Sequence, residues 1–189
     1  MGGKWTSFRR MGQETIEAIL KNNKMETKYE ESQTDNFNLI GSYSRVEAIN
    51  GLIPTNESLF NQYEDHIVLA RDLPRDVAKH LVHTYGTSAL RVVALGEVNE
   101  KAGQRGTNAR LHEDYPFIKS EIAYAAKHEL AMKPNDIICR RVPIAFLNKD
   151  AAKKFLPETI EILAKEHKWS STKKTAELKE AEEMLKYLK

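Results

Sequence analysis

Apolar residues return every three or four positions from about residue 58 to the end of the chain, and this spacing constrains the fold more than any other feature. It places the apolar side chains on one face of an α-helix, which is buried when helices pack together. Pro74 suits the first turn of such a helix, because its missing N–H would have no partner there, and Gly86 suits a helix end. The sequence therefore predicts an all-α fold, a helical bundle.

The helix boundaries follow from start and stop signals. We expect helices over about residues 58–65, 74–85, 87–101 and 114–130, with Thr87 as the cap of the third and a mobile connection over residues 102–113. The helix over 114–130 has a narrow apolar stripe rich in small residues and should be the central helix. Asn148 should cap a later helix that Pro157 interrupts, and Ser170 should open the last helix.

The first ten residues run directly into an amphipathic helix that ends near residue 24. Gly2 and Gly3 allow backbone amides to approach a ligand closely, and the following helix start directs its unpaired N–H groups and its positive dipole end to the same place. Lys4, Arg9 and Arg10 add positive side chains beside it. This segment predicts an anion-binding site, although the same pattern also fits an ordinary loop that enters a helix.

The stretch between this helix and residue 58 has the character of an irregular linker. Gly41, Gly51 and Pro54 punctuate it, and it is rich in Ser, Thr and Asn. We therefore expect three parts: an N-terminal helical segment at residues 1–24, a linker at residues 25–57 and a helical C-terminal domain at residues 58–189.

Composition excludes several classes of protein. The net charge of +2 over 189 residues gives no reason to expect a nucleic acid as a partner. The single cysteine, Cys139, cannot form an intramolecular disulfide and fits a reducing compartment. No run of about 18 apolar residues would cross a membrane as a helix, and we expect no targeting segment in this chain.

Other candidate sites rest on single features. His80 and His83 lie three residues apart without a third ligand at a matching position, and no histidine stands four residues after His128, so we predict no metal site. Motifs of hydrolases, of nucleotide phosphatases and of dinucleotide-binding folds are absent. Arg140 and Arg141 could clamp a carboxylate or phosphate, or could satisfy helix carbonyls and bridge to acidic neighbours.

Ten consecutive residues form a longer motif, Gly2-Gly3-Lys4-Trp5-Thr6-Ser7-Phe8-Arg9-Arg10-Met11. Together with the helix that follows, it resembles the last flavin-contacting motif of FAD-dependent glycerol-3-phosphate dehydrogenases, with Ser7 and Phe8 in place of the commoner Thr and Tyr. Later segments resemble the helical C-terminal domain of that family in the same order: Leu39-Ile40-Gly41 with Tyr43-Ser44, His80-Leu81 with Tyr85-Gly86-Thr87, Leu111-His112 with Asp114-Tyr115-Pro116, Glu121 through Tyr124 to His128-Glu129, Asp136, Arg140-Arg141, Ala145-Phe146-Leu147 and Lys168-Trp169. Ser88 departs from the family, in which Arg often follows Tyr-Gly-Thr.

The resemblance implies an enzyme that oxidises sn-glycerol 3-phosphate to dihydroxyacetone phosphate with FAD and passes the electrons to quinone. It implies that this chain is only the C-terminal portion: the last helix of the FAD-binding domain, a linker and a helical cap domain. The chain alone should then be inactive and should bind FAD only with the missing N-terminal domain. Lys4 is the implied catalytic residue, and the implied cofactor-binding residues are Gly2, Gly3, Lys4, Trp5 and Thr6.

The family also implies a peripheral position at the mitochondrial inner membrane and a homodimer. Two other functions remain open at this point. The chain could belong to the related glycerol-3-phosphate oxidases, which use oxygen, because the choice of acceptor is not legible in this part of the sequence. It could also be a non-catalytic helical module that binds another protein.

Overall fold

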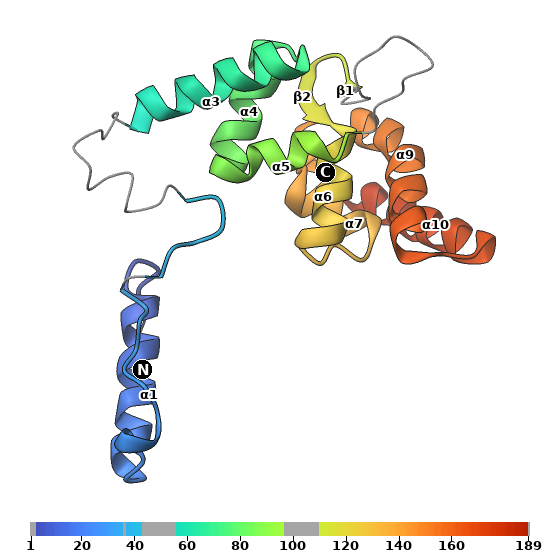
Figure 1. Ribbon diagram of the computed structural model, residues 1–189. Coiled ribbons are helices and arrows are strands. Elements are labelled where there is room, and N and C mark those ends of the chain that lie inside the picture. The colour runs from blue at the N-terminus through green and yellow to red at the C-terminus, as the bar shows by residue number, and fades with distance from the viewer. Residues whose placement is uncertain (1–2, 36, 43–55, 97–109, 189) are drawn as a thin grey trace. The chain divides into compact units, whose positions relative to one another are not determined.

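The computed structural model describes residues 3–35, 37–42, 56–96 and 110–188, and these residues are mostly helical (Figure 1). They belong to two compact units, Met1–Ile40 and Gly41–Lys189. The prediction of an all-α fold is confirmed, with one small two-stranded sheet added to it.

The first unit consists of one helix and a segment that runs back along it (Figure 1). Helix α1 spans Phe8–Asn22, and a short 3-10 turn, η1, follows at Glu26–Lys28. The side chain of Arg9 donates to the backbone carbonyl and to the hydroxyl of Thr34, which joins the returning segment to α1. No residue of α1 is buried, so its apolar residues remain accessible.

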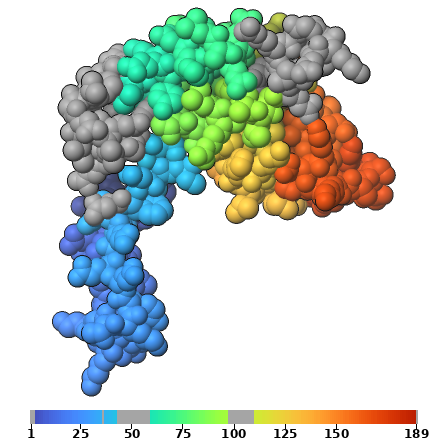
Figure 2. Space-filling model, in the orientation of Figure 1, coloured from blue at the N-terminus to red at the C-terminus, as the bar shows by residue number. Residues whose placement is uncertain are grey.

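The second unit contains the other elements. Its first part comprises α3 at Asn56–Arg71, α4 at Arg75–Tyr85, the 3-10 turn η2 at Gly86–Ser88 and α5 at Ala89–Ala94. Its second part comprises β1 at Arg110–His112, β2 at Tyr115–Ile118, α6 at Lys119–His128, α7 at Pro134–Asp136, the π-helical turn η4 at Ile137–Arg141, α8 at Ile144–Leu147, α9 at Lys149–His167 and α10 at Ser171–Tyr187. Within this unit, α3 to α5 (teal and green) lie on one side and α9 and α10 (orange and red) on the other (Figure 2).

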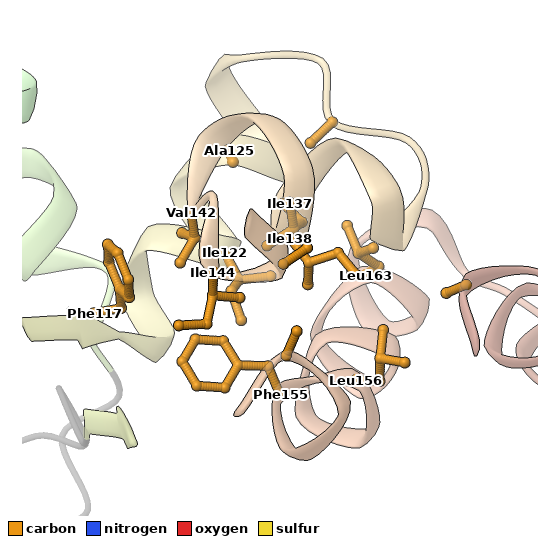
Figure 3. Close-up of a cluster of buried hydrophobic side chains, with 14 of the residues drawn as sticks. Phe117, Ile122, Ala125, Ile137, Ile138, Val142, Ile144, Phe155, Leu156 and Leu163 are labelled. Carbon is orange, nitrogen blue, oxygen red and sulfur yellow. The ribbon is translucent and has the colours of Figure 1, made fainter. Parts of the chain in front are cut away.

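Two clusters of buried apolar side chains hold the second unit together. One cluster lies among α3, α4 and α5 and takes in Ile118 and Tyr124. The other lies among α6, η4, α8, α9 and α10 and includes Ile122, Ala125 and Phe155 (Figure 3). Helix α6 contributes to both clusters, so it is the central helix that its apolar stripe predicts.

A β-hairpin stands where the sequence predicts a connection and the start of a helix. Strands β1 and β2 pair antiparallel, with Arg110 opposite Ile118 and His112 opposite Tyr115. The ring of Tyr115 stacks on Phe117, with centroids 6.1 Å apart, and Phe117 is buried in the second cluster. Packing onto this core stabilises a two-stranded hairpin that would be marginal alone, and the predicted helix start at residue 114 is wrong.

Helix α6 is shorter than predicted at both ends. It begins at Lys119, where the backbone N–H of Ile118, just before the helix, donates to the carboxylate of Glu121 at 2.8 Å. It ends at His128, so Leu130, which the sequence assigns to the apolar face, is exposed and has a positive φ of 57°.

Most of the other helix signals are confirmed. Gly86 ends α4 with a φ of +57°, the amide oxygen of Asn148 accepts the N–H of Ala151 at 3.0 Å, and Ser170 caps α10. The predicted interruption at Pro157 is wrong, because α9 continues through it. Buried residues on either side of the proline hold α9 against the second cluster and compensate for the lost backbone hydrogen bond.

The helices around the first cluster also differ from the prediction. Helix α3 continues to Arg71 instead of ending near residue 65. Residues Gly86–Ser88 form a 3-10 turn, so α5 begins at Ala89 and Thr87 does not cap it. Helix α5 ends at Ala94, before the predicted end near residue 101. Residues 97–109, and residues 36 and 43–55 of the predicted linker, lie outside the described ranges.

Candidate functional site

The candidate site is the turn that leads into α1. The backbone N–H of Ser7 donates to the carbonyl of Lys4 at 3.1 Å, so residues 4–7 form a closed turn immediately before the helix. Ser7 occupies the N-cap position, yet its side chain makes no capping hydrogen bond to the helix. The first turn of α1 therefore presents amides that this side chain leaves open, which is the arrangement that favours an anion.

Two of the three cations beside this turn are engaged by the protein itself. Arg9 donates to Thr34, and Arg10 pairs through Nε with Glu14 at 2.8 Å. The hydrogen bond from Arg10 to Glu14 raises the pKa of Arg10 above its ordinary value. Lys4, by contrast, is exposed, and its side chain forms no hydrogen bond or ion pair with any residue in the described ranges. Of the predicted cationic trio, Lys4 is the side chain left for a ligand.

The other predicted contact residues leave the approach to this turn open. A Cβ on Gly3 would meet only the end of the Met11 side chain, at 3.5 Å, and Thr6 is exposed. Trp5 is 92% exposed, and its ring lies 6.2 Å from that of Phe8. Gly2 lies outside the described residues. The residues present are thus compatible with a negatively charged ligand, because this turn has unpaired helix amides and an exposed ammonium group.

An exposed apolar stripe continues from this turn along α1. Phe8 is 62% exposed, Ile16 57% and Ile19 50%. Gly12 and Ile16 also line a groove between α1 and the returning segment, together with Tyr29. Because an amphipathic helix gains most of its stability from packing its apolar face, this stripe indicates a surface that meets another part of a protein.

A buried carboxylate organises the second unit. Glu121 is fully buried, and its Oε2 accepts hydrogen bonds from His80 Nε2 at 2.8 Å and from the Tyr85 hydroxyl at 3.0 Å, while Oε1 accepts the N–H of Ile118. Burial and the neighbouring carboxylate raise the pKa of Tyr85, so its hydroxyl keeps its proton. This cluster joins α4 to α6 and has a structural role. The sequence motifs named these residues without a role. A glutamate at the third position of a helix can reach back to the backbone N–H before the helix, and this local signal could have indicated the hydrogen bond from Ile118.

Two motifs that are far apart in the sequence meet at a pair of glycines. Gly41 has a φ of +85° and Gly86 a φ of +57°, and the N–H of Thr87 donates to the carbonyl of Gly41 at 3.0 Å. A Cβ on Gly41 would lie 2.5 Å from the carbonyl oxygen of Tyr85, and a Cβ on Gly86 would lie 2.0 Å from that of Gly41. Only glycine fits both positions, so this contact holds Gly41, the first residue of the second unit, against the end of α4.

Arg140 and Arg141 bind acidic neighbours, the structural alternative left open by the sequence. Arg140 donates to the carboxylate of Asp136, and Arg141 donates to the backbone carbonyl of Glu129 at 3.0 Å and lies 3.3 Å from its carboxylate. Over the described part of the chain, no three His, Cys, Asp or Glu side chains are grouped so that they could hold a metal ion. The helices in that part include none that is long and apolar enough to cross a membrane.

Comparison with known proteins identifies the family of this fold. Residues 32–174 match the family described as the C-terminal domain of alpha-glycerophosphate oxidase, and the chain belongs to this family. The mitochondrial glycerol-3-phosphate dehydrogenase of Arabidopsis thaliana is 34% identical over 189 residues, which are 100% of this chain and 29% of that protein.

Two further relatives carry corresponding names. The probable mitochondrial glycerol-3-phosphate dehydrogenase of Dictyostelium discoideum is 35% identical over 98% of this chain and 26% of its own length. The mitochondrial glycerol-3-phosphate dehydrogenase of Homo sapiens is 32% identical over 98% of this chain and 23% of its own length. The chain thus spans between 23% and 29% of these relatives and corresponds to their C-terminal part, which confirms the resemblance seen in the sequence.

Proposed function

We propose that this chain is the C-terminal portion of an enzyme that oxidises sn-glycerol 3-phosphate to dihydroxyacetone phosphate with FAD and passes the electrons to quinone. The observation that carries the proposal is the match of the whole chain to the C-terminal part of glycerol-3-phosphate dehydrogenases. The open turn before α1, with its free Lys4, supports a ligand at the position of the flavin motif.

The three predicted parts then have separate tasks. Residues 1–24 supply the last motif and helix of the FAD-binding domain, and residues 58–189 form the helical cap. Residues 25–57 link these two parts. The exposed apolar stripe of α1 supports this division, because a helix that belongs to another domain would leave that face uncovered in this unit. The chain alone should be inactive, since most of the flavin site lies in the preceding domain.

The turn before α1 would hold part of the FAD, and the cofactor would supply the hydride-accepting chemistry for oxidation of the substrate hydroxyl. The contribution of this chain is electrostatic. The amides that begin α1 and the ammonium group of Lys4 would stabilise the negative charge that develops on the flavin when it is reduced. Gly2 and Gly3 let the backbone approach, and Trp5 and Thr6 complete the turn. Lys4 is the residue that we assign to catalysis.

The test is substitution of Lys4 in the full-length enzyme. Lys4→Ala should lower kcat/KM by about a hundredfold, the size expected when one preorganised donor is lost, while flavin absorbance and thermal unfolding persist. Lys21→Ala, at the other end of α1, is the matched control and should stay at the wild-type level. Normal turnover by Lys4→Ala would refute the assignment.

A flavin absorbance spectrum tests the division of labour. The 189-residue chain should carry no FAD, whereas the full-length enzyme should carry it. Bound flavin on the shorter chain would contradict the proposal that the rest of the site lies in the preceding domain.

The electron acceptor and the cellular location are also proposals. The relatives are named mitochondrial, which supports a mitochondrial location. A peripheral position at the inner membrane and a homodimer are proposed from the family resemblance alone. Because the matched family is described by the oxidase, oxygen is the competing acceptor. Quinone reduction without hydrogen peroxide formation by the full-length enzyme would decide for the dehydrogenase.

A further inference from the structure

Ser7 behaves differently from an ordinary residue at the start of a helix. Serine at the N-cap normally accepts a hydrogen bond from an amide in the first turn of the helix. Here its side chain makes no such bond, and its hydroxyl donates in the opposite direction, to the carbonyl of Lys4 at 3.4 Å. The backbone N–H of Ser7 donates to the same carbonyl at 3.1 Å.

Both donors of Ser7 therefore converge on the backbone of Lys4. The Ser7 hydroxyl also lies 3.7 Å from the sulfur of Met11, whose terminal carbon would be 3.5 Å from a Cβ on Gly3. These contacts fasten the turn over residues 4–7 to the first turn of α1. Ser7 is also the least exposed residue between Gly3 and Arg10, as expected for a residue that holds the turn from inside.

We propose that Ser7 is a positioning residue for Lys4, and this inference rests on the proposed function. Its hydroxyl holds the backbone of Lys4 and, because it caps no amide of α1, leaves the amides of the first turn to the ligand. Ser7 itself touches neither substrate nor cofactor and acts through Lys4. The requirement is for a hydroxyl that donates, so Thr can replace Ser, whereas Ala cannot.

Order of the Lys4 backbone gives a readout that does not depend on activity. In the full-length enzyme, in which α1 is expected to be packed, the NMR order parameter of the Lys4 amide should fall from near 0.85 to below 0.6 in Ser7→Ala, the values typical of rigid and flexible backbone, and should recover in Ser7→Thr. Thr15→Ala is the matched control, because the hydroxyl of Thr15 donates to the carbonyl of Met11 at 2.7 Å on the same helix. Thr15→Ala should leave the Lys4 amide unchanged.

Kinetics of the full-length enzyme test whether Ser7 acts through Lys4. Ser7→Ala should lower kcat/KM for glycerol 3-phosphate about fivefold, the size expected for one neutral hydrogen bond, with flavin content unchanged. In the Lys4→Ala background, the same substitution should have no further effect. Ser7→Thr should restore the rate.

Two results would overturn the proposal: an unchanged order parameter in Ser7→Ala, or an equal loss of activity with and without Lys4. Failure of the proposed function looks different. In that case Lys4→Ala alone would retain normal turnover, while the effect of Ser7→Ala on the Lys4 amide would persist.

Discussion

The two units of this chain differ in how they bury their apolar residues. In the first unit, the 15 residues of α1 include none that is buried. In the second unit, α4 alone buries five residues, and two apolar clusters meet at α6. The second unit therefore has the means to fold by its own packing, whereas the stripe on α1 is suited to be completed by a surface of another domain.

This difference separates stability from chemistry. The residues that we assign to flavin and substrate, such as Lys4, stand on the unit without a core. In the second unit, residues of the family-like motifs such as Tyr85 and Glu121 hold the helices in place through hydrogen bonds. The second unit can thus be rigid by itself, while the proposed cofactor-contacting unit would depend on a neighbouring domain.

The largest expected effect lies in the second cluster. Phe155→Ala removes a fully buried ring that packs edge-on against Phe117, with centroids 6.4 Å apart. It should lower the free energy of unfolding by about 3–5 kcal/mol, measured by chemical denaturation of the chain. Phe146→Ala is the control, because Phe146 is 64% exposed and should change stability little. Equal effects of the two substitutions would contradict the core described for this unit.

A smaller effect is expected at the buried carboxylate. Glu121→Ala leaves the hydroxyl of Tyr85 and the N–H of Ile118 without their acceptor, which should cost about 2–3 kcal/mol. Glu158→Ala removes a surface ion pair with Lys119 at 2.9 Å and should cost less than about 1 kcal/mol. Thermal unfolding of both variants measures the contrast. A loss for Glu121→Ala as small as that for Glu158→Ala would show that the cluster does not join α4 to α6.

The smallest expected effect is local and concerns the glycine contact at the start of the second unit. Gly41→Ala places a Cβ against the carbonyl of Tyr85, at a strain of about 1–3 kcal/mol. The Thr87 amide, which donates to Gly41, should then exchange faster with solvent, while amides of α9 keep their protection. Gly12→Ala is the control, because a Cβ at Gly12 meets nothing within 4 Å. An unchanged exchange rate of the Thr87 amide in Gly41→Ala would contradict the claim that the contact between Gly41 and the Gly86 turn requires glycine.

Local signals made much of the second unit predictable. Asn148 and Ser170 each cap a helix through their own side chain, so two residues and their neighbours decide the boundary. Strand β2 was missed because Pro116 also suits a first helical turn, and only pairing with β1 decides between the two. The burial of Glu121 needs partners from α4 and β2, which no local pattern reveals.

The candidate site, too, has features that a local pattern reveals and features that depend on distant residues. Its motif lies within ten consecutive residues, so the sequence alone could propose Lys4 and the glycines as candidates. The sequence could not show that Arg9 is engaged, because its partner Thr34 lies 25 residues away on the returning segment. Nor could it show that Ser7 turns back to Lys4, since serine at this position normally caps the helix.

Hydrogen exchange of α1 tests the central claim most directly. In the 189-residue chain, the amides of α1 should exchange rapidly, and those of α9 slowly, because only α9 is packed in a core. In the full-length enzyme, α1 should become as protected as α9. If α1 is already as protected as α9 in the shorter chain, the first unit is stable by itself, and the account of it as a helix completed by a flavin-binding domain is contradicted.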